Sequence, residues 1–125
     1  MKTIISTDKA PAAIGPYSQA VKIDHLVFTS GVIPVDPATG IIPEGAAAQA
    51  EQAISNLKNL LAASGCSMAD VIKTTVFIKN MDDFASINEI YAKYFEQPFP
   101  ARSCVEVARL PKDVLIEIEA TGLIK

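Results

Sequence analysis

Residues 102–121 read RSCVEVARLPKDVLIEIEAT, and this stretch shows how the sheet of the protein is built. Arg102–Val107 and Val114–Thr121 are predicted to be two strands joined through residues 109–113, because side chains on an extended backbone alternate between two faces. In the last strand, one face is apolar and consists of Ile116, Ile118 and Ala120. The other face is mixed and consists of Leu115, Glu117 and Glu119. Helices are expected to cover the apolar face, and the mixed face is expected to meet water or another subunit.

The preceding strand also has two unequal faces. Its more polar face is formed by Arg102, Cys104 and Glu106, and its more apolar face by Ser103, Val105 and Val107. Because helices cover apolar faces, they are expected on the side of Val105 rather than on the side of Arg102.

Two helices are predicted upstream of these strands. Ala46–Ser64 has apolar residues at helical spacing, and Gly65 follows as a C-terminal cap. Val71–Lys79 is rich in β-branched residues, which is typical of a strand. Asn80 is then expected to cap a second helix. The apolar face of that helix is predicted to consist of Phe84, Ile87, Tyr91, Tyr94 and Phe95.

The N-terminal part of the chain predicts a β-hairpin. Gln19–Ile23 and Leu26–Ser30 are β-rich runs on either side of Asp24 and His25, and Lys2–Ile5 is a candidate for a short edge strand. After that first strand, the predicted order of elements is β-β-α-β-α-β-β. This order indicates an α+β fold, a single sheet with two helices on one face, in one domain spanning residues 1–125.

Composition and charge narrow the function classes. The 125 residues carry a net charge of −3 with a pI of about 5.0, and the 11 lysines and arginines are scattered, so a nucleic-acid partner is not expected. No apolar stretch approaches the length of a membrane span and the N-terminus lacks an apolar signal region, so we expect a cytoplasmic protein. With two cysteines and one histidine, no metal site is expected.

Arg102 and Glu117 form the most informative pair of polar residues, because both lie within predicted strands. A guanidinium can bind a carboxylate through two parallel hydrogen bonds, and a nearby carboxylate can hold or deprotonate a water molecule. The alternative is a cross-strand ion pair without a chemical role, and the spacing alone favours that alternative.

Tyr17 and Ser30 each lie near a glycine, in the segments Gly15-Pro16-Tyr17 and Ser30-Gly31. A glycine lets a ligand approach the backbone closely, but the sequence alone favours ordinary turn chemistry for these segments. Cys104 shares a strand face with Arg102, but the only histidine lies in the predicted hairpin turn. A Cys–His catalytic pair is therefore not expected.

Five separated segments of the chain resemble motifs of the YjgF/YER057c/UK114 family, also called the reactive-intermediate deaminases, and they follow one another along the chain in the order that the family has. The signature segment is PARSCVEVARLP at residues 100–111, and it continues through Lys112-Asp113 to IEIEA at residues 116–120. The other segments are AIGPYSQA at 13–20, VFTSG at 27–31, VIKTTVFI at 71–78 and FASINEIY at 84–91. The resemblance covers essentially the whole chain. One departure is Val32, where many relatives have glutamine.

The resemblance implies a chorismate-mutase-like fold and a homotrimer, in which three sheets line a central barrel and the helices lie outside. It also implies sites in the clefts between neighbouring subunits. Arg102 would bind the substrate carboxylate, and Glu117 would orient the attacking water. The cleft would be lined by Tyr17, Ser30, Gly31, Asn88 and Cys104, with Cys104 contributing main-chain groups.

The implied reaction is the hydrolysis of 2-imino acids, namely 2-iminobutanoate and 2-iminopropanoate released by pyridoxal-phosphate dehydratases, to 2-oxo acids and ammonia. No cofactor would be needed. The alternative function is a non-catalytic trimer that binds a small carboxylate or has a regulatory role. RNA cleavage and translation inhibition, which the family also suggests, are disfavoured by the acidic pI.

Overall fold

The computed structural model describes all residues, 1–125, and the predicted order of elements is confirmed with small differences at the element ends. The elements are β1 (Thr3–Ile5), β2 (Ala20–Ile23), β3 (Leu26–Thr29), α1 (Ala46–Ala63), β4 (Val71–Ile78), α2 (Phe84–Tyr94), β5 (Ala101–Glu106) and β6 (Ile116–Leu123). Short 3₁₀ turns precede β4, α2 and β6. Neither helix is long and apolar enough to span a bilayer.

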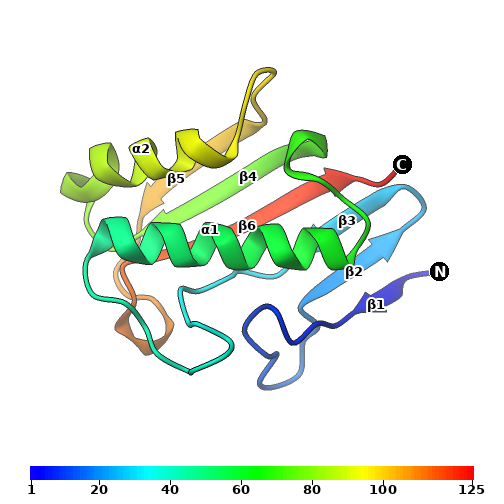
Figure 1. The fold of residues 1–125 in the computed structure, drawn as a ribbon, viewed down its shortest axis with the longest axis horizontal. Coiled ribbons are helices and arrows are strands. Elements are labelled where there is room, and N and C mark those ends of the chain that lie inside the picture. The colour runs from blue at the N-terminus through cyan, green and yellow to red at the C-terminus, as the bar shows by residue number, and fades with distance from the viewer.

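All six strands belong to one mixed sheet, with the order β1-β2-β3-β6-β4-β5. Only β4 and β5 pair in parallel, because α2 connects them as a crossover, while the other neighbours are antiparallel. Both helices lie on the same face of the sheet, with α1 across its middle and α2 beside β4 and β5 (Figure 1). The predicted α+β sheet with two helices on one face is therefore confirmed.

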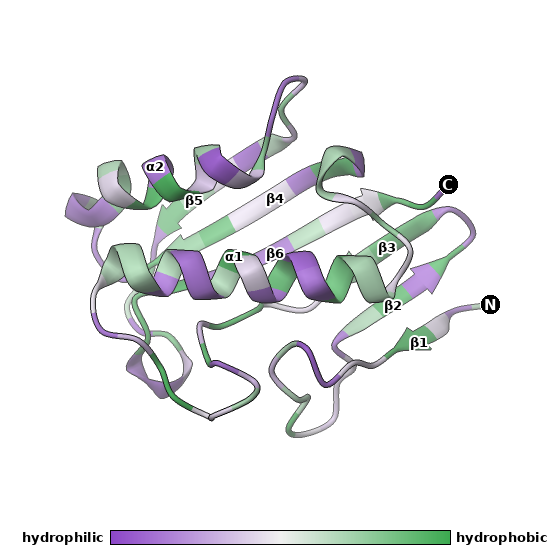
Figure 2. Cartoon of the chain, viewed as in Figure 1, coloured by the Kyte–Doolittle hydropathy of each residue, from purple (hydrophilic) through white to green (hydrophobic).

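The core lies between this face and the two helices. Helix α1 alternates apolar and polar bands along its length (Figure 2), and its apolar stripe packs on β6. The side chains that are fully buried there include Ile54, Leu57, Leu61, Ile116 and Ile118. The face of β6 that was predicted to be apolar is thus the one covered by helices.

The entry to α2 differs in detail from the prediction. Asn80 caps the 3₁₀ turn Met81–Asp83 rather than α2 itself, because its side-chain oxygen accepts a hydrogen bond from the backbone N–H of Asp82 at 2.9 Å. The turn runs directly into α2 at Phe84.

The prediction for β5 was wrong about which face the helices cover. Arg102 is paired in register with Thr74 of β4, which is fully buried under α2. Residues in register point to the same face of a sheet, so Arg102 and Cys104 face α2, whereas Val105 lies on the other face and is 43% exposed. The alternation of polar and apolar residues along β5 indicated the wrong face, because the aromatic side chains of α2 can cover a guanidinium as well as an apolar group.

The open face of the sheet carries a mixture of polar and apolar side chains. Phe28, Ile23 and Leu123 are each about 40% exposed there, close to the polar residues Thr121 and Glu119 on β6. The predicted mixed face of β6 is therefore on this side and is not covered by any element of the chain (Figure 1).

Candidate functional site

The predicted site residues fall into two groups on opposite faces of the sheet. Thr74 of β4 is in register with Arg102, and Phe77 of β4 is in register with Glu117. Residues three apart in a strand point to opposite faces, so the side chains of Arg102 and Glu117 point away from each other. We call the Arg102 group, with Asn88 and Cys104, the arginine half-site, and the Glu117 group, with Tyr17, Ser30 and Gly31, the glutamate half-site.

In the arginine half-site, the guanidinium of Arg102 is held by one stripe of α2. Its Nη1 donates a hydrogen bond to Asn88 Oδ1 at 2.8 Å, and its Cζ lies 4.7 Å from the ring centre of Tyr91 and 5.4 Å from that of Phe84. Phe84, Asn88 and Tyr91 follow the i, i+4, i+7 spacing of one helix face. The helix therefore orients the guanidinium through two aromatic rings and one amide group. All three of these groups are uncharged, so the positive charge of Arg102 is not neutralised by them.

No carboxylate neutralises Arg102 within the chain. The ion pairs of the molecule are Arg109 with Asp113 and Lys125 with Asp70. The alternative in which Arg102 and Glu117 form a structural ion pair is thus contradicted for the single chain. An exposed guanidinium with one hydrogen bond to a neutral amide retains donors for a planar anion.

Cys104 lies two residues along β5 from Arg102 and is half-buried beside the core. Burial raises the pKa of its thiol, and the nearby Arg102 charge lowers it only in part. His25 lies in the β2–β3 turn, and two strands of the sheet, β6 and β4, separate β3 from β5. No base in the chain is placed to activate this thiol.

In the glutamate half-site, the carboxylate of Glu117 lies directly against the backbone of Gly31. A Cβ atom built at Gly31 would overlap both Oε2 and Cδ of Glu117. The chain that follows β3 pairs with β6 through Val32 and Ile118, whose backbone N–H and C=O groups exchange hydrogen bonds of 2.7 and 3.0 Å. The absence of a side chain at Gly31 is therefore what lets the carboxylate occupy this position.

The electrostatic surroundings of Glu117 favour its protonated form. Burial raises the pKa of the Glu117 carboxyl above its ordinary value of 4.5, and repulsion from Glu119 on the same face raises it further. A carboxylate with a raised pKa is a stronger proton acceptor, and its acid form can return the proton. Glu117 is thus suited to move a proton to and from a bound water.

A cavity of about 750 Å³ opens beside Glu117 and is bounded by Tyr17, Ser30 and Gly31. Ser30 Oγ donates to the carbonyl of Ser18 at 2.6 Å. The hydroxyl of Tyr17, a half-exposed residue, lies 3.4 Å from the N–H of Ile14. These contacts fix the walls of the cavity, so the structure brings together all four predicted residues of this half-site.

Three residues that shape the half-sites were missed by the sequence analysis. Phe84 and Tyr91 were assigned to the apolar face of α2 without a role toward Arg102, although their spacing relative to Asn88 carried that signal. Gln19 is buried, and its amide bonds the backbone of Thr7 and Pro11 at 2.7 to 3.0 Å, which fixes the loop that walls the cavity. A lone glutamine at a strand end gives no such signal in sequence.

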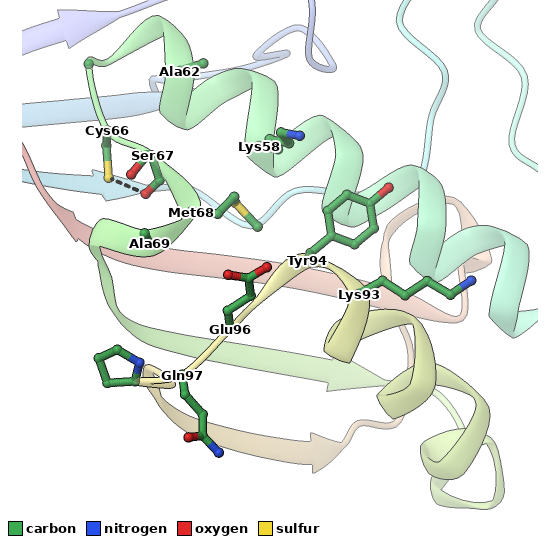
Figure 3. Close-up of a pocket in the computed structure, with 12 residues that line it drawn as sticks. Lys58, Ala62, Cys66, Ser67, Met68, Ala69, Lys93, Tyr94, Glu96 and Gln97 are labelled. Carbon is green, nitrogen blue, oxygen red and sulfur yellow. Dashed lines mark hydrogen bonds between the residues drawn. The ribbon is translucent and has the colours of Figure 1, made fainter.

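A second hollow lies between the C-terminal ends of α1 and α2, away from both half-sites. Figure 3 shows Tyr94 reaching from α2 toward α1, with Met68 and Cys66 on the opposite wall. The hydroxyl of Tyr94 donates to Glu51 of α1 at 2.8 Å. None of the predicted site residues lines this hollow.

Comparison with known proteins places the chain in a family. The sequence pattern described as Endoribonuclease L-PSP matches residues 7–124. The chain is 54% identical to the 2-iminobutanoate/2-iminopropanoate deaminase of Escherichia coli, over 98% of both chains. The crystal structure of E. coli TdcF with bound serine has a TM-score of 0.94 and 51% identity, covering 98% of this chain and 99% of that one.

A crystal structure described as a putative endoribonuclease from Thermotoga maritima has a TM-score of 0.96 and 50% identity, covering 100% of this chain and 99% of that one. These similarities span the full chain, and they confirm the resemblance seen in the signature segment at residues 100–111. The protein belongs to the RidA/YjgF/RutC family.

Proposed function

We propose that this protein is an imine deaminase that hydrolyses 2-imino acids, 2-iminobutanoate and 2-iminopropanoate, to 2-oxo acids and ammonia. The observation that carries the proposal is the Arg102 guanidinium, which is oriented by α2 and has no acidic partner. A 2-imino acid offers a planar carboxylate next to the reacting carbon, and an unpaired guanidinium matches that group. The identity of 54% with a deaminase of this name supports the same substrate class.

The active site is formed between two copies of the chain in this proposal. Arg102 and Glu117 point away from each other within one chain, so a substrate can meet both only if the arginine half-site of one copy faces the glutamate half-site of the next. Asn88 and the main chain of Cys104 would complete the first half, and Tyr17, Ser30 and Gly31 the second. The whole chain, residues 1–125, acts as one deaminase domain.

A homotrimer provides such an arrangement. The open face of the sheet, with its exposed Phe28, Val105 and Leu123, would line a central barrel once three copies close around it. Light scattering is expected to give about 40 kDa, the mass of three chains of 13.3 kDa. A monomer at micromolar concentration would contradict the shared site.

The reaction requires proton transfers around one carbon atom. Arg102 holds the carboxylate of the protonated imine, and Glu117 accepts a proton from a water molecule as the water oxygen bonds to the imine carbon. Glu117 then returns this proton to the nitrogen of the resulting carbinolamine. The C–N bond breaks, ammonia leaves with the electron pair, and the carbinol hydroxyl loses its proton to give the 2-oxo acid.

An RNA substrate, which the description of the family pattern suggests, fits this site less well. Glu117 and Glu119 share the face next to the cavity, and two carboxylates repel a phosphate backbone. A non-catalytic carboxylate binder would need Arg102 but would have no use for a carboxylate with a raised pKa. Glu117 therefore favours the enzyme over either alternative.

The direct test is an assay in which a pyridoxal-phosphate threonine dehydratase generates 2-iminobutanoate in situ. Addition of this protein is expected to accelerate the disappearance of the imine and the release of ammonia beyond the uncatalysed rate. If imine decay is unchanged by micromolar protein whose trimeric mass has been verified, the proposed function is wrong.

A further inference from the structure

A pair of buried hydroxyl groups lies beneath the arginine half-site. Tyr91 Oη and Thr74 Oγ1 are 2.7 Å apart and form a hydrogen bond between α2 and β4. Thr74 is fully buried and Tyr91 is only 7% exposed. A buried pair of this kind satisfies both hydroxyls and also fixes the ring that bears one of them.

The ring of Tyr91 is fixed from a second direction by Phe95. The two ring centres are 4.3 Å apart with an interplanar angle of 28°, and Phe95 is almost fully buried. Tyr91 is thus attached to the sheet at its hydroxyl and to the core at its ring. The guanidinium of Arg102 lies 4.7 Å from the same ring centre.

This arrangement connects the buried core of the molecule to an exposed side chain. Arg102 is exposed and lies on β5, which is an edge strand, so its backbone alone allows many rotamers. The Tyr91 ring provides a surface for the guanidinium, and Asn88 fixes the rotation of the guanidinium on that surface through Nη1. The remaining donors are then presented toward the cleft before any ligand arrives.

We propose that Tyr91 and Thr74 are positioning residues for substrate binding, and that their hydrogen bond fixes the aromatic surface on which Arg102 is pre-oriented toward the carboxylate. The inference rests on the proposed function, because it assigns Arg102 the carboxylate. Neither residue touches the substrate, so their loss weakens binding without removing a reacting group. Pre-orientation reduces the entropy lost on binding, which is why the effect appears in the dissociation constant.

The test uses the full-length protein and 2-oxobutanoate, the stable product, as the probe of carboxylate binding in calorimetry. Thr74→Val and Tyr91→Phe each leave one buried hydroxyl without a partner, so each is expected to lower the melting temperature. Each is also expected to raise the Kd of 2-oxobutanoate roughly 3- to 10-fold, with kcat in the imine assay changed much less than KM.

The double variant Thr74→Val/Tyr91→Phe separates positioning from stability. It removes both hydroxyls, so no buried group is left unpaired and the melting temperature is expected to recover toward that of the wild type. The Kd is expected to stay raised, because the ring is still not attached to β4. If the Kd recovers together with the melting temperature, the hydroxyl pair is structural only and the inference is wrong.

Two reference variants complete the experiment. Tyr94→Phe removes the hydroxyl of the other tyrosine near this end of α2, which bonds Glu51 and has no contact with Arg102, and it is expected to leave the Kd unchanged. Arg102→Ala is expected to weaken binding more than any of these variants. If Arg102→Ala binds 2-oxobutanoate like the wild type, the proposed role of Arg102 fails. If only Arg102→Ala weakens binding, the role of Arg102 stands and the positioning inference fails.

Discussion

The two half-sites solve the problem of holding a charged group in opposite ways. Arg102 is an exposed side chain whose direction comes from contacts with Asn88 and Tyr91 on a covering helix. Glu117 is a partly buried side chain whose position comes from the lack of a side chain at Gly31. The first arrangement leaves the positive charge of Arg102 exposed to solvent. The second makes the negative charge of the Glu117 carboxylate energetically unfavourable.

This difference matches the two tasks that the proposed reaction assigns to the half-sites. A group that binds a carboxylate works best when its charge is permanent and its donors are oriented. A group that accepts and returns a proton works best when its pKa is raised toward neutral pH. The fold places these two environments on opposite faces of one sheet. In the proposed trimer, a second copy of the chain would bring them together.

The largest effect is expected for Glu117→Gln, which removes the proton acceptor and keeps the shape. Activity on 2-iminobutanoate is expected to fall by roughly 10²- to 10⁴-fold, the usual contribution of general acid–base catalysis. Binding of 2-oxobutanoate is expected to change little, because Arg102 is intact. A variant with more than half of the wild-type kcat would show that Glu117 is not the proton-transfer group.

The same variant has a predicted effect on stability with a definite sign. The pKa of the Glu117 carboxyl is raised in the folded state, so ionisation of this group destabilises the fold. The stability that the protonated carboxyl contributes is fully present below its ordinary pKa of 4.5, and it is lost as the pH rises through the pKa of the folded state. At neutral pH, Glu117→Gln is therefore expected to melt at a higher temperature than the wild type. The difference is expected to disappear when thermal unfolding is followed below about pH 4.

A somewhat smaller effect is expected for Arg102→Lys, which keeps the charge but loses the planar fork. The lost charge-assisted hydrogen bonds contribute about 2–3 kcal/mol, which corresponds to a fall of roughly 30- to 150-fold in kcat/KM. Arg102→Ala is expected to be worse. Because Arg102 is exposed and unpaired with any acid, both variants are expected to keep their trimeric mass and melting temperature, and dissociation of either would identify a structural residue instead.

Gly31→Ala sharpens the comparison, since it moves the carboxylate of Glu117 without altering its chemistry. The added methyl group overlaps only the end of a flexible side chain, so the melting temperature is expected to change little. A displacement of about 1 Å in a catalytic group is expected to lower kcat by roughly 10- to 100-fold. In the Glu117→Gln background the same substitution is expected to cost almost nothing, and additive losses would refute the coupling.

The smallest effect is expected for Cys104→Ala. Burial raises the pKa of this thiol, and no base in the chain is placed to activate it, so it is not expected to act as a nucleophile. Most of the deaminase activity is expected to remain when kcat/KM is measured. A complete loss with an intact trimer would mean that the thiol takes part in the reaction.

Hydrophobic periodicity and turn residues were sufficient to predict the order of the elements and the covered face of β6. They failed for β5, because Val105 and Val107 suggested a buried face, whereas β5 ends at Glu106 and Val105 lies exposed on the open face of the sheet. The covering of Arg102 depends on residues of α2 about ten to twenty positions away, and alternation within one strand contains no information about them. Arg102 and Glu117 lie on opposite faces because of the register between β4, β5 and β6, and a single sequence does not specify that register.

The central claim, that each active site combines the arginine half-site of one copy with the glutamate half-site of another, can be tested by mixing two inactive variants. Arg102→Ala and Glu117→Gln chains would be unfolded together in equal amounts, refolded and assayed on 2-iminobutanoate. Every mixed trimer then contains one site in three with both groups intact, and random assembly makes about three quarters of the trimers mixed. The mixture is therefore expected to recover about a quarter of the wild-type activity. If the mixture, verified to contain mixed trimers, is as inactive as either variant alone, the two groups do not act across a subunit boundary.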